Sequence, residues 1–519
     1  MISNYSKDFN FFFFLFLFSI IFYTTTNLVT LADPILVQHG WRQSHNALNA
    51  FYIIENGFSL NYETPNFGEP WSVPHEFPIY HWCVSILTII FEMPVTYMGR
   101  LVSLIFGLLT CIPIYYSLIK LNISRNIIFL CLTLFLSAPS YIYWSGTFMI
   151  ETTALFFTCC FIFLTIKIIK NEHNLVTFLF LTLFLSLALL QKITTAFPAM
   201  LVSSLILLIY LFKTNSFKSN YKLVLKIILS FAIANLASLS WFVYADHLKS
   251  MNPLMNGLTL ENSIHWYFGT LGDKFSSQLW LGTIFEGTII PGSGIFIGFL
   301  SFTYLIFKNK NKNLQFIIYS LLLFFLVPFL VHTRVHINHK YYQVANLVFW
   351  SIISGISIDF YFKKYLKIKD FYYYAILIFV LIVNYAFFFH KYFFHPKSQM
   401  GNQQERTMVL GKYLQNNTEK NYPIVIFGYG GSSTLTFYSH RKALSVNGEG
   451  QGIKVIKEPF KFFTSLPKTY IFCPALDSKG NKIKGYTDAE AKKLLKEKYT
   501  NHKSEEFLDC EIIYIEPPS

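Results

Sequence analysis

Polar segments interrupt this apolar chain at four places, and the first of them combines several side chains capable of chemistry. The stretch HGWRQSHN, residues 39–46, contains Arg42, Gln43 and His45. His45 is a candidate general base, because a neutral imidazole has an ordinary pKa of about 6.5 and can accept a proton near neutral pH. Arg42 and Gln43 are candidate substrate-binding residues, since both side chains donate hydrogen bonds to oxygen atoms.

The outer segment that contains this stretch, residues 33–77, ends in a second group of ionisable residues. Its return to apolar sequence reads VPHEFPIYHW, residues 73–82, and contains Glu76 and His81. Glu76 is a second candidate base, because a positioned carboxylate can accept the proton of a substrate hydroxyl. His81 is a candidate substrate-binding residue.

Two further charged residues lie at the ends of apolar runs. Glu151 stands in FMIETTALFF and Lys192 stands in LLQKITTAFPA. A charged side chain at membrane depth is costly, so its presence there usually marks a pathway or a reaction site. Glu151 is therefore a third candidate for proton transfer, and Lys192 is a candidate for binding a negatively charged group.

The fourth polar segment is HTRVHINHKYYQ, residues 332–343, between two apolar runs. Its candidate substrate-binding residues are Arg334, His339, Lys340, Tyr341 and Tyr342. The histidines follow an H-x-x-x-H-x-x-H spacing, but no acid or cysteine accompanies them. Because a metal site normally draws on such ligands, we expect no metal here, and no motif indicates a cofactor.

Composition places these segments in a membrane protein. The chain has 519 residues, of which 53% are hydrophobic, 13% are charged and 57 are phenylalanine. A helix must supply about 20 apolar residues to cross the bilayer. Runs of this kind occur at about 10–31, 98–119, 126–140, 152–169, 174–190, 195–212, 224–244, 289–307, 314–331, 344–361 and 371–390. They predict a mostly α, polytopic transmembrane bundle of 11 to 13 spans, the higher counts depending on the short segment 78–92.

The net charge of +14 comes largely from short loops between the apolar runs. Lysines gather in loops at 167–173, 213–226, 308–313 and 363–370, which is the pattern of loops that stay in the cytoplasm. This distribution argues against a nucleic-acid partner. With these loops inside, the outer segment 33–77, Glu151, the long stretch 245–288 and residues 332–343 face outward. We expect Glu151, Lys192 and the turn 339–342 to converge with the first outer loop on one cavity.

The composition changes after residue 395. Residues 396–519 alternate helical and strand patterns, which predict a small soluble α/β domain attached to a transmembrane domain of residues 1–395. Span parity places this domain outside the membrane. Cys473 and Cys510 lie in it, and an oxidising compartment would permit a bridge between them.

The order of these motifs resembles that of the GT-C membrane glycosyltransferases, in the branch of the aminoarabinose and protein mannosyltransferases. The resemblance covers about residues 10–390. It rests on the large first outer loop, FPIYHW at 77–82, Gly99-Arg100-Leu101, Glu151, Lys192 and the turn HINHKYYQVAN. It implies an inverting transferase that moves a sugar from a polyprenyl-phosphate carrier to a lipid, glycan or protein acceptor. It also implies an integral protein of the bacterial inner membrane, with an extracytoplasmic site.

The sequence departs from the family pattern at the base. The family has an acid early in the first outer loop, whereas the matching stretch here, WRQSHNA, has none. His45 lies closest to that position and is the leading candidate, with Glu76 and Glu151 as alternatives. The family also often has a lysine where Glu76 stands. A substitute cation for the donor phosphate would come from Arg42, Lys192, Arg334 or Lys340.

A transporter or flippase of lipid-linked substrates is the alternative function. Transporters tend to combine short outer loops, helices broken at mid-membrane and two related halves. This chain has a long first outer loop, shows no internal repeat and gathers its polar residues at one membrane face. The sequence therefore favours a transferase, and it leaves the sugar and the acceptor open.

Overall fold

The computed structural model describes residues 2–215, 220–292, 295–394, 402–476, 483 and 487–516. These form two compact units. Unit 1 comprises Met1–Leu31, Arg100–Trp241 and Ile264–Phe394, and unit 2 comprises Ala32–Gly99, Phe242–Ser263 and His395–Ser519. Unit 2 thus combines the C-terminal residues with the first outer loop and with part of the stretch 245–288.

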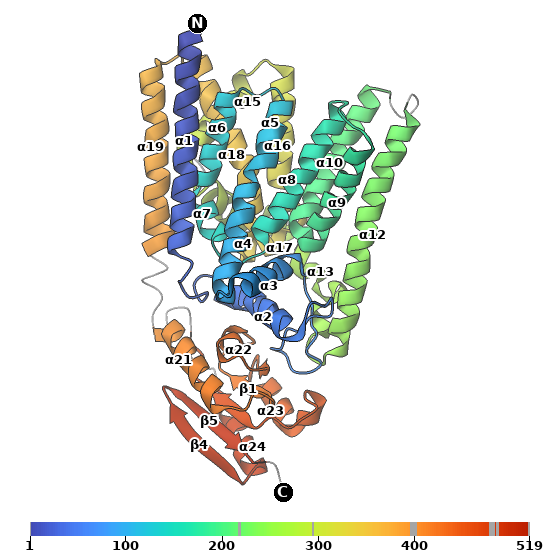
Figure 1. The fold of residues 1–519 in the computed structure, drawn as a ribbon, viewed down its shortest axis with the longest axis vertical. Helices are drawn as coiled ribbons and strands as arrows, with labels where there is room; N and C mark the ends of the chain where they lie inside the picture. Colours follow the sequence, from blue (N-terminus) through green and yellow to red (C-terminus); the bar gives the residue numbers. More distant parts are fainter. Residues whose placement is uncertain are drawn as a thin grey trace. The chain divides into compact units, whose positions relative to one another are not determined.

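Unit 1 is a bundle of apolar helices (Figure 1). Eight helical segments are long and apolar enough to cross a membrane, counted over the described residues. They are Phe9–Val29 within α1 (Ile2–Val29), Val95–Lys120 (α4, Val95–Leu109, with α5, Cys111–Lys120), α8 (Glu151–Ile169), α10 (Ile193–Lys213), α12 (Tyr221–Met251), α16 (Lys312–Val331), Lys340–Tyr365 (η3, Lys340–Gln343, α18, Val344–Asp359, and η4, Phe360–Tyr365) and Asp370–Phe394 (α19, Asp370–Phe388, with η5, Phe389–Phe394). The expected polytopic α-helical fold is thereby confirmed.

The remaining expected spans are shorter or bent. Helices α6 (Arg125–Ser137) and α7 (Pro139–Ser145) meet at a bend of 62° and together make a ninth candidate. Proline lacks a backbone N–H and restricts the residue before it, which explains the break at Pro139. Helices α9 (Leu175–Gln191) and α15 (Ile295–Lys308) are apolar but too short to count alone.

The predicted span 289–307 starts before the corresponding helix α15 does. Residues up to Ile289 belong to the π-helix η2 (Gln278–Ile289), and Pro291 and Gly292 lie in a turn before α15. Neither residue favours a continuous helix, because proline removes a hydrogen-bond donor and glycine adds conformational freedom.

Small residues let the helices of unit 1 approach closely. At Gly355 in α18, an added Cβ would lie 2.6 Å from Cys131 Sγ and 3.1 Å from the Cys131 Cα atom in α6. A larger residue would push these helices apart. Close packing through small residues is the usual way in which helices associate where lipid removes the hydrophobic driving force.

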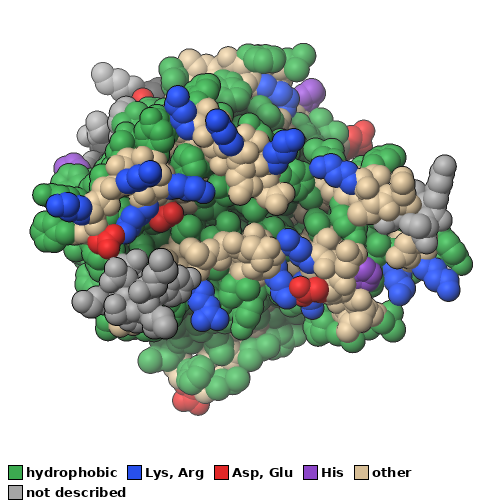
Figure 2. Space-filling model, turned by 90° about the horizontal axis from the view of Figure 1, so that it is seen from above, with side chains coloured by type: hydrophobic (Ala, Val, Ile, Leu, Met, Phe, Trp, Pro, Cys, Tyr) green, Lys and Arg blue, Asp and Glu red, His purple; other side chains and the backbone are tan. Residues whose placement is uncertain are grey.

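Basic side chains gather at one end of unit 1. Figure 2 shows Lys and Arg on this face, which is the end where α1 begins in Figure 1. Lys167, Lys213 and Lys308 stand in the last turns of α8, α10 and α15. Cations there interact favourably with the negative helix ends. Lys218, in one of the loops expected inside, lies outside the described residues.

Unit 2 contains a five-stranded sheet in the order β2-β1-β3-β5-β4. Strand β1 (Ile424–Phe427) is parallel to β2 (Ala443–Ser445) and β3 (Thr469–Phe472), while β5 (Cys510–Ile515) is antiparallel to β3 and to β4 (His502–Phe507). The accompanying helices are α21 (Asn402–Asn417), α22 (Thr434–Ser439), α23 (Glu449–Lys457), η6 (Pro459–Lys461) and α24 (Ala489–Lys498).

Side chains on both faces of strand β1 are buried. Val425 and Phe427 belong to one apolar cluster, whereas Ile424 and Ile426 belong to another. This division follows from the alternation of side chains along a strand. Cys473 and Cys510 form a disulfide. The sequence therefore identified the two cysteines that pair and the α/β character of this domain.

Candidate active site

The polar stretch of the first outer loop lies on a helix. Helix α2 (Gly40–Asn56) starts after His39, which has a left-handed backbone conformation with φ of 53°. Residues three apart share one face of a helix, so Arg42 and His45 lie next to each other. Gln43 is fully buried and its amide donates to the Gln38 carbonyl at 3.1 Å. The loop thus presents its candidate residues on a rigid element.

Arg42 forms an ion pair with Glu76, which follows 34 residues later. The side chains are 12% and 19% exposed, so water screens their attraction only in part. Tyr62 supports this arrangement: its hydroxyl donates to the Glu76 carbonyl oxygen at 2.8 Å and accepts from the His75 backbone N–H at 3.1 Å. The guanidinium, the tyrosine and the loop return therefore fix the position of the Glu76 carboxylate.

The environment of Glu76 keeps it ionised. Burial alone would raise the pKa of Glu76, but the positive charge of Arg42 beside it lowers that pKa below its ordinary value. Only Oε1 of the carboxylate meets Arg42. Oε2 is buried and has no hydrogen-bond partner within the described residues. Glu76 thus combines a negative charge with one oxygen able to accept a proton.

The environment of His45 weakens it as a base. The side chain is 5% exposed, and its ring lies 4.9 Å from that of His75, centre to centre. Burial, together with His75 and the positive charge of Arg42, lowers the pKa of His45 well below its ordinary value. The imidazole is therefore neutral at physiological pH and takes up a proton with difficulty. His81 is fully buried in α3 (Ile79–Phe91), 5.8 Å from the ring of Tyr62.

The lowered pKa of His45 predicts acid sensitivity of unit 2. As the pH falls below about 6.5, His45 binds a proton in the unfolded chain but stays neutral in the folded chain. Stability is then lost by up to about 1.4 kcal/mol per pH unit. We expect the thermal unfolding temperature to decrease as the pH is lowered from 6.5 to 5. His45→Gln should make this decrease smaller. An equal decrease of the unfolding temperature with pH in the wild type and in His45→Gln would contradict this assignment.

A second cluster forms in unit 1 around Lys192. Its ammonium group pairs with Glu151 Oε1, and the two side chains are 7% and 4% exposed. Glu151 is the first residue of α8, where the positive helix end favours an acid. Lys192 occupies an extended break between α9 and α10, with φ of −161° and ψ of 98°. The break turns the lysine side chain out of the regular helix.

Two tyrosines complete this cluster. The Lys192 ammonium lies 3.7 Å from the ring centre of Tyr342 and 5.2 Å from that of Tyr341. Such cation–π contacts stabilise a cation without neutralising it. His339 stacks on both rings, at 5.3 Å from Tyr341 and 5.8 Å from Tyr342. The structure thus brings together three segments separated by up to about 190 residues: the start of α8, the α9–α10 break and the turn 339–342.

The other residues of the fourth polar segment have different surroundings. Arg334 is exposed and pairs with Asp273 of α14 (Leu271–Phe275). Lys340 is also exposed. His336, in α17 (Thr333–Asn338), is buried with its ring 5.8 Å from that of Tyr342.

Within the described ranges, no group of three or more His, Cys, Asp or Glu residues is arranged to hold a metal ion. The arrangement found instead is two buried acid–base pairs, each with one carboxylate oxygen that lacks a partner in the described part of the chain. One pair suits proton transfer, and the other suits the binding of a negatively charged leaving group.

Several solved structures resemble this chain, among them the following two. ArnT from Cupriavidus metallidurans, bound to undecaprenyl phosphate, matches with a TM-score of 0.61 at 11% identity, over 95% of this chain and 97% of its own. The oligosaccharyltransferase AglB from Archaeoglobus fulgidus, in complex with an inhibitory peptide and a dolichol-phosphate, matches with a TM-score of 0.56 at 12% identity, over 89% and 69%. Both are GT-C glycosyltransferases. The chain has the GT-C fold. No protein-family model and no curated protein matches its sequence.

The chain also contains an apolar cavity of about 110 Å³ between α5, α8, α10, α16 and α18. On α8 its lining starts at Cys159, eight residues beyond Glu151 or about 12 Å along the helix. None of its lining residues is an Asp, Glu, Lys, Arg or His. The cavity suits an apolar chain and lacks groups for acid–base chemistry.

Sequence reasoning missed several neighbours of the candidate residues. Tyr62 and His75 support Glu76 and His45, yet no motif distinguishes them. Lys274 donates to the Leu330 carbonyl at 2.6 Å and to Thr333 Oγ1 at 3.3 Å, which ties α14 to the fourth polar segment. A lone lysine within the long stretch 245–288 gave no signal of this contact.

Proposed function

We propose that the protein is an inverting glycosyltransferase that moves a sugar from a polyprenyl-phosphate carrier to an acceptor hydroxyl. The observation that carries this proposal is the buried Lys192–Glu151 pair with its tyrosine face, in a chain with the GT-C fold. A buried cation at a helix break is suited to a phosphate, and ArnT was crystallised with undecaprenyl phosphate. The acceptor is a lipid, a glycan or a protein.

The reaction requires a base and a stabilised leaving group. The acceptor hydroxyl loses its proton to the base as its oxygen attacks the anomeric carbon. The bond between that carbon and the phosphate oxygen breaks, and polyprenyl phosphate departs with the bonding electrons. The configuration at the anomeric carbon is thereby inverted. Lys192 would hold the phosphate, since a positioned cation stabilises the charge that develops on it. Tyr341, Tyr342 and His339 would orient the lysine.

Glu76 is the base that this proposal favours. It is ionised, Arg42 orients it, and its Oε2 can accept a proton. His45 and His81 would line the acceptor side as neutral groups, together with Gln43. Glu151 would neutralise the positive charge of Lys192 before the phosphate binds. Arg334 and Lys340 would attract the negatively charged donor.

We further propose that the reaction occurs at the extracytoplasmic face of a bacterial inner membrane. The Cys473–Cys510 disulfide favours an oxidising compartment. Asn417 is an exposed residue of the C-terminal domain. A cysteine introduced there should react in intact cells with a membrane-impermeant maleimide, whereas Lys310→Cys in a basic loop should react only after permeabilisation. Reversed labelling would overturn this topology.

The proposed activity is tested by comparing lipids of cells with and without the gene. Loss of an active transferase should cause a sugar-loaded polyprenyl phosphate to accumulate and one glycosylated product to disappear. Both changes should be reversed by the wild-type gene but not by a Glu76→Gln variant. Identical profiles of carrier lipids and glycosylated products in all strains would contradict the proposal.

A further inference from the structure

The first outer loop and the C-terminal domain are joined by main-chain hydrogen bonds within unit 2. Residues 65–68 run along the outer edge of strand β2, where Phe67 and Leu444 form an antiparallel bridge. The Ala443 and Ser445 N–H groups donate to the carbonyls of Pro65 and Asn66, both at 3.0 Å. The loop thereby extends the sheet of the C-terminal domain by one short edge segment.

Asn66 connects the same segment to two parts of the C-terminal domain through its side chain. Its amide Nδ2 donates to the Gly431 carbonyl at 2.8 Å, and its Oδ1 accepts from the Thr436 hydroxyl at 2.6 Å. Asn66 and Thr436 are both fully buried. Loss of either partner would leave a buried polar atom without a hydrogen bond, which is costly.

A separate contact reaches helix α2. Ser433, at the end of the glycine-rich turn 428–433, donates from its hydroxyl to the Trp41 carbonyl at 3.1 Å. Trp41 directly precedes Arg42. On the other side of the loop, Thr64 donates to Asn49 Oδ1 of α2 at 2.8 Å. Helix α2 is therefore held at its first turn by the C-terminal domain and at its middle by the segment that the domain binds.

These contacts extend to the candidate acceptor side. The Phe67 ring lies 6.4 Å from that of His45, centre to centre. The residue that pairs with strand β2 thus also contacts a side chain next to the Arg42–Glu76 pair. The C-terminal domain can therefore affect the reaction through these contacts alone, without contributing a reacting side chain.

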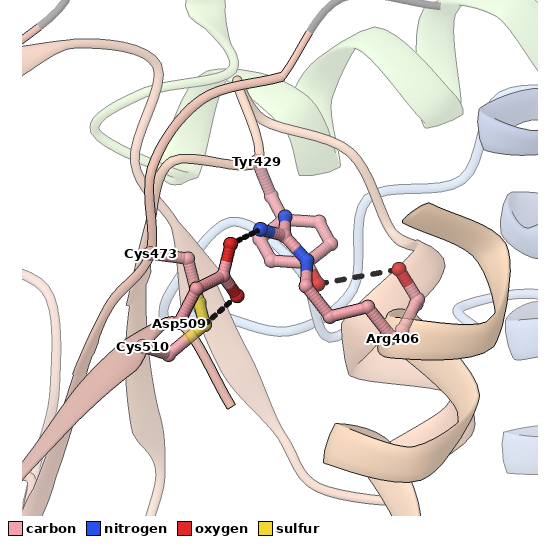
Figure 3. Close-up of a disulfide and its surroundings, with 6 residues drawn as sticks. Arg406, Tyr429, Cys473, Asp509 and Cys510 are labelled. Atoms are coloured by element: carbon pink, nitrogen blue, oxygen red, sulfur yellow. Dashed lines mark hydrogen bonds and ion pairs between the residues drawn. A yellow bond between two sulfur atoms is a disulfide. The ribbon is translucent and has the colours of Figure 1, made fainter. Parts of the chain in front are cut away.

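The turn that makes these contacts is itself rigidly supported. At Gly428, with φ of 86°, an added Cβ would lie 2.0 Å from the Cys473 carbonyl oxygen, so only glycine fits. Figure 3 shows Tyr429 beneath Arg406, whose guanidinium pairs with Asp509 at 2.6 Å beside the Cys473–Cys510 disulfide. The turn is therefore fixed to the ends of strands β3 and β5.

We propose that the C-terminal domain is a positioning element for the acceptor side of the site, and that Asn66 and Thr436 are its principal positioning residues. This inference rests on the proposed function for its catalytic consequence only. Its structural part, that Thr436 restrains α2 through Asn66, is independent of which reaction the protein catalyses.

The test compares three single variants of the full-length protein in detergent or nanodiscs. Thr436→Val keeps the shape of the side chain but removes the hydroxyl, and Thr436→Ser restores it. Thr434→Val is the matched control, because the Thr434 hydroxyl lies on the same short helix but meets Ser432 within the domain. Amide hydrogen exchange is measured in α2, in residues 64–69 and in strands β1 and β3.

We expect Thr436→Val to speed exchange in α2 and in residues 64–69 by about 10-fold, the effect of losing one buried hydrogen bond, with β1 and β3 unchanged. Thr436→Ser and Thr434→Val should match the wild type. In transfer assays, kcat of Thr436→Val should fall by about 10-fold with the donor KM unchanged.

Two results would overturn the proposal. Exchange in α2 that is unaffected by Thr436→Val would show that the contact does not restrain this helix. Faster exchange throughout β1 and β3 would show that Thr436 only stabilises its own domain. If the wild-type protein transfers no sugar, the proposed function fails, while the exchange measurement still decides whether the domain positions α2. Ser433→Ala, which removes the bond to Trp41, provides a second variant with the same expected pattern.

Discussion

Replacing Glu76 with glutamine is expected to lower the turnover of sugar transfer by about 10²–10⁴-fold, the usual worth of a positioned general base. Glutamine has nearly the same shape but cannot accept the proton of the acceptor hydroxyl. The measurement is the initial rate at saturating donor and acceptor, with donor binding recorded separately. Donor binding should be unchanged, because Glu76 acts on the acceptor.

His45 provides the comparison for this prediction. The pKa of both side chains is lowered, but Arg42 pairs with Glu76 and keeps it negatively charged, so His45→Gln should lower turnover by less than Glu76→Gln does. Glutamine retains a hydrogen-bonding side chain of similar size. A Glu76→Gln enzyme of near-normal activity, beside an inactive His45→Gln enzyme, would reverse the assignment of the base. Glu76→Gln leaves Arg42 without its charged partner, which could destabilise the fold. Thermal unfolding of both variants is therefore measured as a control for loss of fold.

Removing the charge of Lys192 is expected to lower turnover by about 10²–10³-fold, as loss of one electrostatic stabiliser of the leaving group does. Lys192→Met alone would leave Glu151 buried without its cation, at a cost of about 3–5 kcal/mol of stability. The double variant Lys192→Met/Glu151→Gln removes both charges. We expect it to unfold at a temperature close to that of the wild type and to remain inactive.

The same double variant separates a structural from a catalytic role. A buried ion pair replaced by neutral side chains of similar volume is often neutral in stability. A stable double variant with near-normal turnover would show that the pair only holds α8 and the α9–α10 break together. A stable double variant that no longer binds polyprenyl phosphate would support the phosphate assignment directly.

The transmembrane part was predictable because a bilayer imposes a simple pattern. Long apolar runs identified the helices, and basic residues marked one set of loops. The errors arose where the backbone chemistry of single residues interrupts a run of suitable composition, as at Pro139 and at Pro291-Gly292. Strand β2 has three residues, and β4 is HKSEEF, a polar strand at the sheet edge, so neither carries a recognisable strand pattern.

The candidate site was predictable where burial of a charge is expensive. Glu151 and Lys192 were identified individually for that reason, and in the structure they pair. The surroundings of His45 were not predictable, because they depend on packing against His75 and Arg42 in the folded loop. An ordinary imidazole pKa suggested His45 as the base, whereas burial in the folded loop lowers that pKa; which residue is the base is decided by the variants proposed above. The bonds between Asn66 and the C-terminal domain are set by long-range packing, which no local pattern records.

The most direct measurement uses the purified protein with carrier lipids extracted from cells that lack the gene. The membrane and envelope fraction of the same cells is added, so that the sugar-loaded donor and a lipid, glycan or protein acceptor are both present. We predict that the wild-type protein releases free polyprenyl phosphate and forms one glycosylated product, and that Lys192→Met/Glu151→Gln does neither. If the wild-type protein leaves every polyprenyl-phosphate sugar in the extract intact, as the double variant does, the protein is not the transferase proposed.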